Sequence, residues 1–333
     1  LRKSFIQDNF FGIAKDGTAG RNNASGLFVN AQEQSTVQDL QILNNIAANN
    51  GRHGIHIQRD DQASFTSVNP EAGQNRAVTI AGNQLFGNGN SGIFIDTRNG
   101  SADLLDFEIH DNSIGLTSTA IGAIAAGTAL ANTQDGIRLF AQADARILVD
   151  IIENDIEFNT GNGINLQTRN NSNTDKRQVG GTWIKNTISN NTASGINIGG
   201  RHGLYDEATG TRSPLYIGQE GTDPTDGKSL GNVFENNGQF ALQINVGGTD
   251  NGDVGFTNNM VRLNRAGGVS ISSNQELLAV KKNSFIANQG IGLDLISTGT
   301  VSATVRDNLI TQQTNIVNGN FGDGVAQRLG PPG

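Results

Sequence analysis

One pattern of asparagine and glycine returns along nearly the whole of this 333-residue chain. In the copy that begins at Asn83, a second asparagine follows at Asn88 and a glycine at Gly92, and the alternating pair Ile93 and Ile95 comes next. Further copies begin at Asn9, Asn45, Asn112, Asn154, Asn186, Asn232, Asn259 and Asn283, with a partial copy from Asn308. The copies from Asn9 and Asn112 contain insertions, and the copy from Asn232 has an alanine in place of the glycine. Self-similarity in one register is typical of an architecture of stacked repeats.

Apolar residues hold fixed places within the copies. One lies three residues before the first asparagine, at Ile6, Ile42, Ile80, Ile109, Ile151, Trp183, Phe256, Val280 and Val305. Two more alternate after the glycine, as Ile55 and Ile57 do. A period of two with many β-branched residues is the signature of strands that bury one face. No segment has a convincing helical period, so we expect almost no helix.

These strands return every 24 to 46 residues without hairpin turns or helices between them. A solenoid accommodates such strands, because each coil adds one rung to each of three parallel sheets. The sequence therefore predicts an all-β fold, a single right-handed parallel β-helix of about nine coils with loop insertions. We expect the β-helix to cover residues 1–310, and residues 311–333 to form an irregular C-terminal extension or cap.

The asparagines and glycines have separate expected roles in this solenoid. Rungs stack about 4.8 Å apart, so identical residues form columns along the axis. We expect the asparagines to lie at tight turns, to tolerate a left-handed backbone and to hydrogen bond along the stack. We expect the glycines to open the third strand of each coil at a sharp turn.

With this repeat the chain resembles the parallel β-helix repeat superfamily, the fold of pectate lyases, polysaccharide epimerases and many bacterial surface proteins. The resemblance covers roughly Leu1 to Ile310 and implies a fold more than a function. The alginate epimerases of this superfamily carry an Asp-Pro-His motif. Here the only Asp-Pro is Asp223-Pro224, which Thr225 follows. Nor does the chain contain a pectate-lyase-like set of aspartates with a nearby arginine.

Composition excludes several classes of function. The net charge of -8 disfavours non-specific nucleic-acid binding, which needs a basic surface. The absence of cysteine excludes disulfides, thiol nucleophiles and cysteine metal sites, and suits a secreted or cell-surface bacterial protein. The longest apolar run, residues 120–131, contains two glycines and is too short to span a membrane. Because the chain begins at Leu1 without a signal-like segment, we expect a processed form or part of a longer polypeptide.

The third strand of each coil offers a candidate ligand-binding face. Its outward positions, in two columns, include Phe28, His56, Phe94, Asp96, Arg138 and Phe140. Aromatic rings can stack on sugar C–H groups, and charged groups can bond hydroxyls or carboxylates. Insertions at residues 60–74, 97–103, 168–180 and 201–227 follow this strand and could wall the face. The alternative is that both columns form only a solvated surface.

The first strand offers a weaker candidate for catalysis. Glu108 and Asp150 occupy the same outward position in successive coils, with His110 beside Glu108. Two carboxylates one rung apart can perturb each other's pKa enough for acid–base chemistry. The alternative is that Arg146 pairs with Asp150.

The insertion that contains Asp223 and Asp226 is a candidate calcium-binding loop, because it is rich in carboxylates and glycines. No established calcium motif accompanies these residues, so a solvated loop is the alternative. The sequence indicates no cofactor with certainty, and calcium is the one candidate.

Three functions remain open. The chain could be a structural or adhesive module of a secreted or surface protein that self-associates or contacts a surface glycan. It could instead be a polysaccharide lyase or hydrolase. A β-helix that binds carbohydrate without cleaving it is the third alternative.

Overall fold

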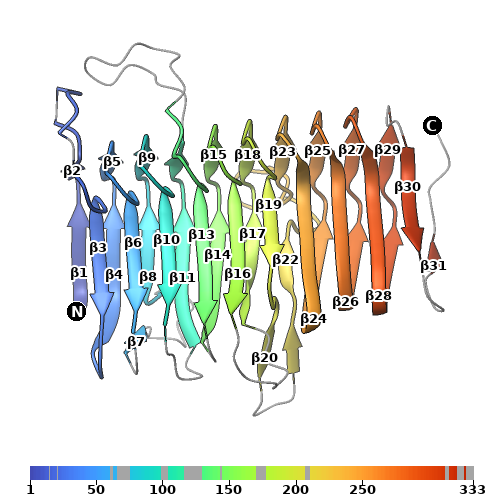
Figure 1. The fold of residues 1–333 in the computed structure, drawn as a ribbon, viewed down its shortest axis with the longest axis horizontal. Coiled ribbons are helices and arrows are strands. Elements are labelled where there is room, and N and C mark those ends of the chain that lie inside the picture. The colour runs from blue at the N-terminus through green and yellow to red at the C-terminus, as the bar shows by residue number, and fades with distance from the viewer. Residues whose placement is uncertain are drawn as a thin grey trace.

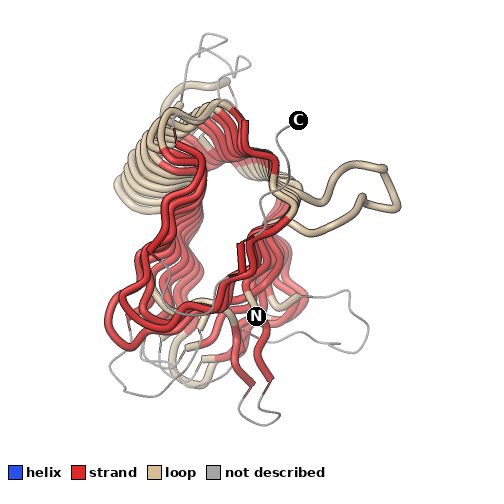
Figure 2. The backbone as a smooth tube through the Cα atoms, turned by 90° about the vertical axis from the view of Figure 1, so that its right-hand side faces the viewer, coloured by secondary structure: helices blue, strands red, loops and turns tan. Residues whose placement is uncertain are grey.

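The computed structural model describes residues 1–14, 16–20, 22–60, 63–65, 76–98, 104–115, 130–142, 145–169, 178–206, 211–311, 315–320 and 326–327. These residues form strands and loops and contain no helix. The strands wind into one tube, in which successive coils lie side by side from the N-terminal end onward (Figure 1). Figure 2 looks along the tube, with strands on its flanks and loops at its corners. The predicted all-β, right-handed parallel β-helix is confirmed.

Each coil contributes strands to three faces, which we call the first, second and third sheets. The first sheet contains β1 (Arg2–Gln7), β4 (Thr36–Leu43), β8 (Val78–Ala81), β11 (Leu104–His110), β14 (Arg146–Ile152), β17 (Val179–Ile184) and β22 (Leu215–Ile217). The second contains β2 (Phe10–Phe11), β5 (Ile46–Ala48), β9 (Gln84–Phe86), β12 (Ser113–Ile114), β15 (Asp155–Glu157), β18 (Thr187–Ser189), β23 (Val233–Glu235), β25 (Met260–Arg262), β27 (Ser284–Ile286) and β29 (Leu309–Thr311). The third contains β3 (Leu27–Ala31), β6 (Ile55–Arg59), β10 (Ile93–Thr97), β13 (Ile137–Gln142), β16 (Ile164–Arg169), β19 (Ile196–Gly199) and β30 (Asn315–Asn320).

Three long strands join two faces. They are β24 (Phe240–Thr257), β26 (Gly267–Lys281) and β28 (Ile291–Arg306), and each runs from the third sheet of one coil to the first sheet of the next. Smaller elements lie at the margins: β7 (Ser64–Phe65) pairs with β4, β20 (Leu204–Asp206) pairs antiparallel with β21 (Thr211–Ser213), and β31 (Ala326–Gln327) pairs with β28. Most residues of the predicted insertions at 60–74, 97–103 and 168–180 lie outside the described residues.

Strand register follows the repeat. In the third sheet, Ile55 pairs with Ile93 and Ile93 with Ile137, so the positions after each glycine form one column. Beyond the expected end of the β-helix, β30 pairs with β28 from Ile291↔Asn315 to Ile296↔Asn320 and adds another rung to the third sheet.

Apolar side chains fill the tube. The inward residues of all three sheets belong to one core cluster, and most of them are completely buried. Gly92 illustrates why the repeat keeps a glycine. A Cβ at this residue would lie 2.5 Å from Cγ2 of Ile114, which projects from the second sheet of the next coil. Gly92 is not among the residues with positive φ, so close packing, rather than the expected sharp turn, requires it.

Two asparagine ladders run along the corners of the tube. In the first, Nδ2 of each asparagine donates to Oδ1 of the next at 2.9–3.1 Å; its members are Asn9, Asn45, Asn83, Asn112, Asn154, Asn186, Asn232, Asn259, Asn283 and Asn308. The second has Nδ2 to Oδ1 distances of 2.9–3.3 Å and contains Asn22, Asn50, Asn88, Asn132, Asn159, Asn191, Asn237, Asn264 and Asn288. The expected hydrogen bonding along the stack is confirmed.

The left-handed backbone lies one residue before the ladder asparagines, not at them. Glu153 (φ 55°) and Lys185 (φ 59°) precede members of the first ladder, and Phe158 (φ 56°) precedes a member of the second. The expectation that the asparagines themselves adopt this conformation was wrong. Their amides must point along the axis to bond both neighbours, and the turn is made by the residue before them.

Candidate functional site

Ring side chains stack on the outward face of the third sheet. The ring centroids of Phe28 and His56 lie 4.7 Å apart, and those of His56 and Phe94 lie 4.9 Å apart at an interplanar angle of 23°. The guanidinium carbon of Arg138 lies 5.5 Å from the Phe94 centroid, within the range of a cation–π interaction. The structure therefore brings four predicted binding residues together, and we call Phe28, His56, Phe94 and Arg138 the ring stack.

Members of the ring stack cover one another. His56 is only 6% exposed, since it lies between the two phenylalanines, whereas Phe28 at the N-terminal end of the stack is 51% exposed. A ligand on this face would therefore meet ring edges and the outer side of Phe28. Interior ring faces are not available to it.

Two buried histidines belong to this region. His53 packs 4.7 Å from Phe94 and 5.2 Å from His56, and its Nδ1 accepts a hydrogen bond from the backbone N of Ser91 at 3.3 Å. Burial lowers the pKa of His53 to about 3 and that of His56 to about 4. Both imidazoles are therefore neutral near pH 7 and contribute ring surface rather than charge.

The second outward column carries Asp96 and Phe140, which pair in register between β10 and β13. Asp96 is 2% exposed, and its carboxylate accepts hydrogen bonds from Nε of Arg98 at 2.7 Å and from Nε2 of Gln142 at 3.2 Å. Phe140 is half-buried. Asp96 is thus a fixed anion under the surface, and Phe140 supplies partly exposed apolar area beside it.

Amide side chains continue both columns toward the C-terminal coils. Arg138 Nη2 donates to Oε1 of Gln167 at 2.9 Å, and Asn197 Nδ2 donates to Oδ1 of Asn165 at 3.1 Å. Gln167 and Asn197 are half-buried and partly face outward, whereas Asn165 is buried and also donates to Asp135. The third sheet therefore presents an apolar patch followed by a polar track.

The first sheet contains a hollow of about 330 Å³ on its outer side. Its floor is Thr79 and Ala81 of β8, whose short side chains lie between longer ones in the coils before and after. Its walls are Asp39, Gln41 and Leu43 of β4, Glu108 and His110 of β11, and Arg76. We call this site the first-sheet hollow.

The polar groups that line the hollow differ in whether they have hydrogen-bond partners. Asp39 is 7% exposed, and its Oδ1 has no hydrogen-bond partner among the described residues. A φ of 48° at Asp39 interrupts the alternation of β4. His110 Nδ1 lies 2.8 Å from Oδ2 of Asp111, outside the hollow. The buried carboxylate of Asp39 is unusual, because buried acceptors normally have donors.

Of the three predicted catalytic residues, Asp150 is committed to other contacts. Arg76 forms an ion pair with Asp150 and a 2.6 Å hydrogen bond with Asp106, and the backbone N of Thr182 donates to Asp150 at 2.8 Å. Burial raises the pKa of Asp106. The suggested partner Arg146 was wrong, since Arg76 reaches Asp150 from the insertion side. Glu108 pairs in register with Asp150, as expected, and Glu108 and His110 both line the hollow.

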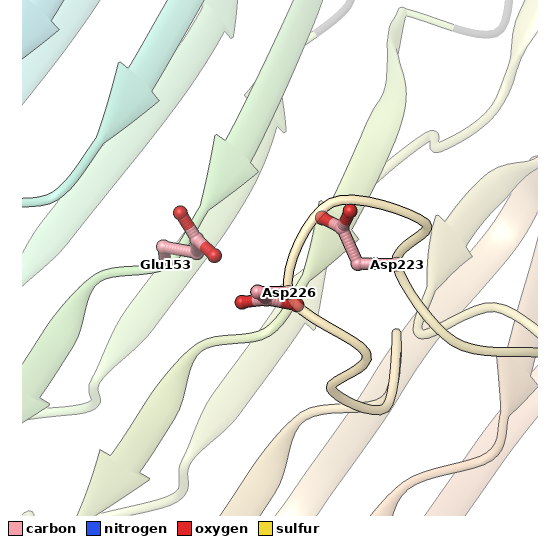
Figure 3. A group of neighbouring side chains, drawn as sticks. All are labelled: Glu153, Asp223 and Asp226. Carbon is pink, nitrogen blue, oxygen red and sulfur yellow. The ribbon is translucent and has the colours of Figure 1, made fainter.

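Asp223 and Asp226 lie on the loop between β22 and β23, beside Glu153 (Figure 3). Potential ligand oxygens of the three residues lie within 4.8 Å of one another. The ammonium of Lys185 lies among them, since Nζ donates to Asp223 at 2.9 Å and to Asp226 at 3.1 Å and pairs with Glu153. The hydrogen bond from Lys185 lowers the pKa of Asp223 to about 2. The predicted acidic group exists, and a lysine cation already contacts all three carboxylates.

Sequence reasoning missed Asp39, Arg76, Glu153 and Lys185. A readable signal existed for the last two, because both directly precede ladder asparagines in successive coils, and opposite charges one rung apart attract. No comparable signal marked Asp39 or Arg76.

No protein-family model matches the chain, and no curated protein matches it by sequence. No helical segment with the length and hydropathy to cross a membrane occurs among the described residues. A similar solved structure is the catalytic unit of a thermostable GH87 α-1,3-glucanase from Streptomyces thermodiastaticus strain HF3-3, with a TM-score of 0.52, 14% identity and coverage of 89% of this chain. The match covers 47% of the glucanase chain, so this chain spans about half of that structure's length. At this identity the likeness is one of fold, and it agrees with the right-handed parallel β-helix described above.

Proposed function

We propose that the protein is a structural or adhesive β-helical module of a secreted or cell-surface protein, and that its third sheet binds a polysaccharide without cleaving it. The observation that carries this proposal is the ring stack, which ends in a phenylalanine that is 51% exposed. An exposed aromatic ring on the same face as a track of polar amides suits a sugar chain, because a sugar C–H face can pack on the ring while hydroxyls further along the chain bond the amides. The similar structure is a glucanase, which adds support for a glycan partner.

Binding is favoured over cleavage on this face because its carboxylate is not placed for acid–base chemistry. Asp96 is almost fully buried and accepts hydrogen bonds from Arg98 and Gln142. A glycosidase needs two carboxyl groups on either side of the scissile bond. Beside the ring stack, the described strands of the third sheet supply this carboxylate in β10, and Asp60, which follows β6, is held by a hydrogen bond from Gln58 at 2.6 Å.

Calcium is not part of the proposed binding step. A calcium ion at Glu153, Asp223 and Asp226 would have to displace the Lys185 ammonium, which contacts all three. We propose that Lys185 does the work of a cation there and fixes the loop to the body of the β-helix.

A glycan array, run with calcium and with EDTA, tests the proposal, followed by product analysis on any polymer that binds. We expect calcium-independent binding without new reducing ends. Phe28→Ala should weaken binding about tenfold, because stacking on one aromatic ring contributes about 1 kcal/mol or slightly more. Met260→Ala is the matched control, since Met260 is 40% exposed on the second sheet and should not affect binding.

Failure to bind any glycan, or equal affinity of the Phe28→Ala variant, would remove the third sheet as a sugar-binding face. Self-association or a protein partner would then be the better explanation of an adhesive module. Cleavage of a bound polymer would contradict the non-catalytic part of the proposal.

A polysaccharide-active enzyme is the second candidate, and one observation favours it. Glu108 lines the first-sheet hollow together with the buried carboxylate of Asp39. If product analysis detects cleavage, Glu108→Gln should abolish it while Phe28→Ala should leave the rate per bound chain unchanged.

A further inference from the structure

The first-sheet hollow has an excess of negative charge. Asp39 and Glu108 line it directly, and Arg76 is its one cationic side chain. Arg76 is already paired with Asp106 and Asp150. Three carboxylates, those of Asp106, Asp150 and Glu108, therefore act on one guanidinium, and neither Glu108 nor Asp39 forms an ion pair with it among the described residues.

Besides the negative charge of the hollow, the burial of the Asp39 carboxylate also indicates a ligand. It is 7% exposed and lines the hollow, and its Oδ1 has no hydrogen-bond partner in the described part of the chain. A buried carboxylate that lacks donors is unfavourable, because its lost hydration is not replaced. A ligand that brings a hydrogen-bond donor or a positive charge would relieve this.

The shape of the hollow suits one small polar unit. Its volume of about 330 Å³ lies at the lower end of small-molecule sites, which range over roughly 300–1,000 Å³. Leu43 and Ala81 give it an apolar side, while Gln41 and Thr79 provide an amide and a hydroxyl. Apolar contact with hydroxyl-bonding groups fits a sugar ring. The carboxylates distinguish among sugars, since they attract an amine and repel an acid.

We propose that the first-sheet hollow binds a sugar unit with a free amine, as found in a deacetylated aminoglycan, with the amine held by Asp39 and Glu108. This site is separate from the third-sheet face and does not depend on the function proposed for it. Charge-assisted hydrogen bonds to two carboxylates supply the affinity. An N-acetylated unit lacks the charge, and a uronic acid brings the wrong one.

Calorimetric titration with a short glucosamine oligomer tests this proposal, with the N-acetylated oligomer and an oligogalacturonate as comparisons. We expect the glucosamine oligomer to bind at least tenfold more tightly than the acetylated one, and the oligogalacturonate not to bind. Asp39→Asn and Glu108→Gln should each weaken binding at least tenfold. Thr79→Leu, which fills the floor without changing charge, should do the same.

Asp307→Asn is the matched control, because Asp307 is an exposed acidic residue at the distant end of the first sheet. It should leave the affinity within about twofold. Phe28→Ala in the glycan array tests the third-sheet face separately, so failure of this site and failure of that face remain distinguishable. Circular dichroism and thermal unfolding establish that each variant is folded.

Several results would overturn the proposal. Equal binding of the acetylated oligomer would remove the role of the amine. Equal binding of a lysine oligomer of the same charge would indicate attraction to an acidic protein rather than a site. If calcium displaced the glucosamine oligomer and Asp39→Asn abolished calcium binding, the hollow would be a cation site instead.

Discussion

Replacing Asn154 by alanine tests whether the first asparagine ladder holds the coils together. Asn154 Nδ2 donates to Asn186 Oδ1 at 3.0 Å, to Ile109 O at 2.9 Å and to Ile152 O at 3.0 Å. Its Oδ1 accepts from the backbone N of Asn112 at 3.0 Å and from Asn112 Nδ2 at 2.9 Å. Asn154 is fully buried, so water does not reach these groups in the native protein. One side chain thus connects three coils.

The expected loss of stability follows from the groups left behind. After Asn154→Ala, the backbone N of Asn112 and the carbonyl of Ile109 lose these partners inside the tube. A buried polar group without a partner costs about 1–3 kcal/mol, so the unfolding free energy should fall by about 4 kcal/mol. Asn197→Ala is the matched control. Its amide is half-buried and donates one bond to Asn165, so its loss should cost less than about 1 kcal/mol.

Urea unfolding measures both variants, but a solenoid need not unfold in one step. Hydrogen exchange at the Asn112 amide therefore provides the local measurement, and protection of that amide should be lost in Asn154→Ala. Asn154→Asp should be worse than alanine at pH 7, since a carboxylate cannot donate to Asn186 Oδ1. A difference below about 1 kcal/mol between Asn154→Ala and Asn197→Ala would refute the reasoning that the ladder is a main source of stability.

Three further predictions concern single positions. Leu263→Asn should raise the unfolding free energy, measured by urea unfolding, by about 1 kcal/mol. Leu263 is 45% exposed at a φ of 59°, and asparagine tolerates this conformation better than leucine. Unchanged or lower stability would contradict this expectation. Lys185→Met should make the thermal stability depend on millimolar calcium, because three carboxylates would lose their ammonium partner and could bind the ion instead. An equal calcium response of the unchanged protein would contradict the idea that Lys185 takes the place of calcium. Burial lowers the pKa of His53 to about 3 and of His56 to about 4, so between pH 6.5 and 4 the unfolded chain binds more protons and the unfolding free energy falls as the pH falls. His56→Phe keeps a ring in the stack and should make this pH dependence shallower in urea unfolding; an unchanged slope would contradict the assignment.

Residue spacing was sufficient to predict which side chains share a column. In a parallel solenoid each coil adds one rung, so residues at equal distances from the ladder asparagine must become neighbours. Phe28, His56, Phe94 and Arg138 satisfy this rule and pair in consecutive registers. The register pairing of Glu108 with Asp150 follows from the same rule.

The spacing of the repeat does not predict the contacts of side chains that lie outside these columns. Arg76 ends an insertion and reaches Asp106 and Asp150 in two later coils, a contact that no constant spacing implies. Asp39 points away from its expected alternation because of a left-handed backbone within β4. The left-handed backbone recurs at Lys3 (φ 48°) in the preceding coil, but the spacing of the repeat predicts neither this conformation nor the contacts of Arg76.

The difference between residues in repeated columns and residues outside them indicates where function arises in such a fold. In a repeated column each member meets a similar neighbour at one rung's distance, as in the ring stack and the amides of the third sheet. Such a column packs tightly, but its polar atoms are not all paired, since Nε2 of His56 and Nε of Arg138 are buried without a hydrogen-bond partner among the described residues. A hollow needs a break in the repeat, because similar side chains at one rung's distance fill an unbroken column. The first-sheet hollow has two such breaks, a short floor at Thr79 and Ala81 and the left-handed backbone at Asp39, whose buried Oδ1 lacks a hydrogen-bond partner among the residues that the structure describes. Binding chemistry in this protein should therefore be most selective at the hollow, where the repeat is broken, while the third sheet offers a longer and less selective surface.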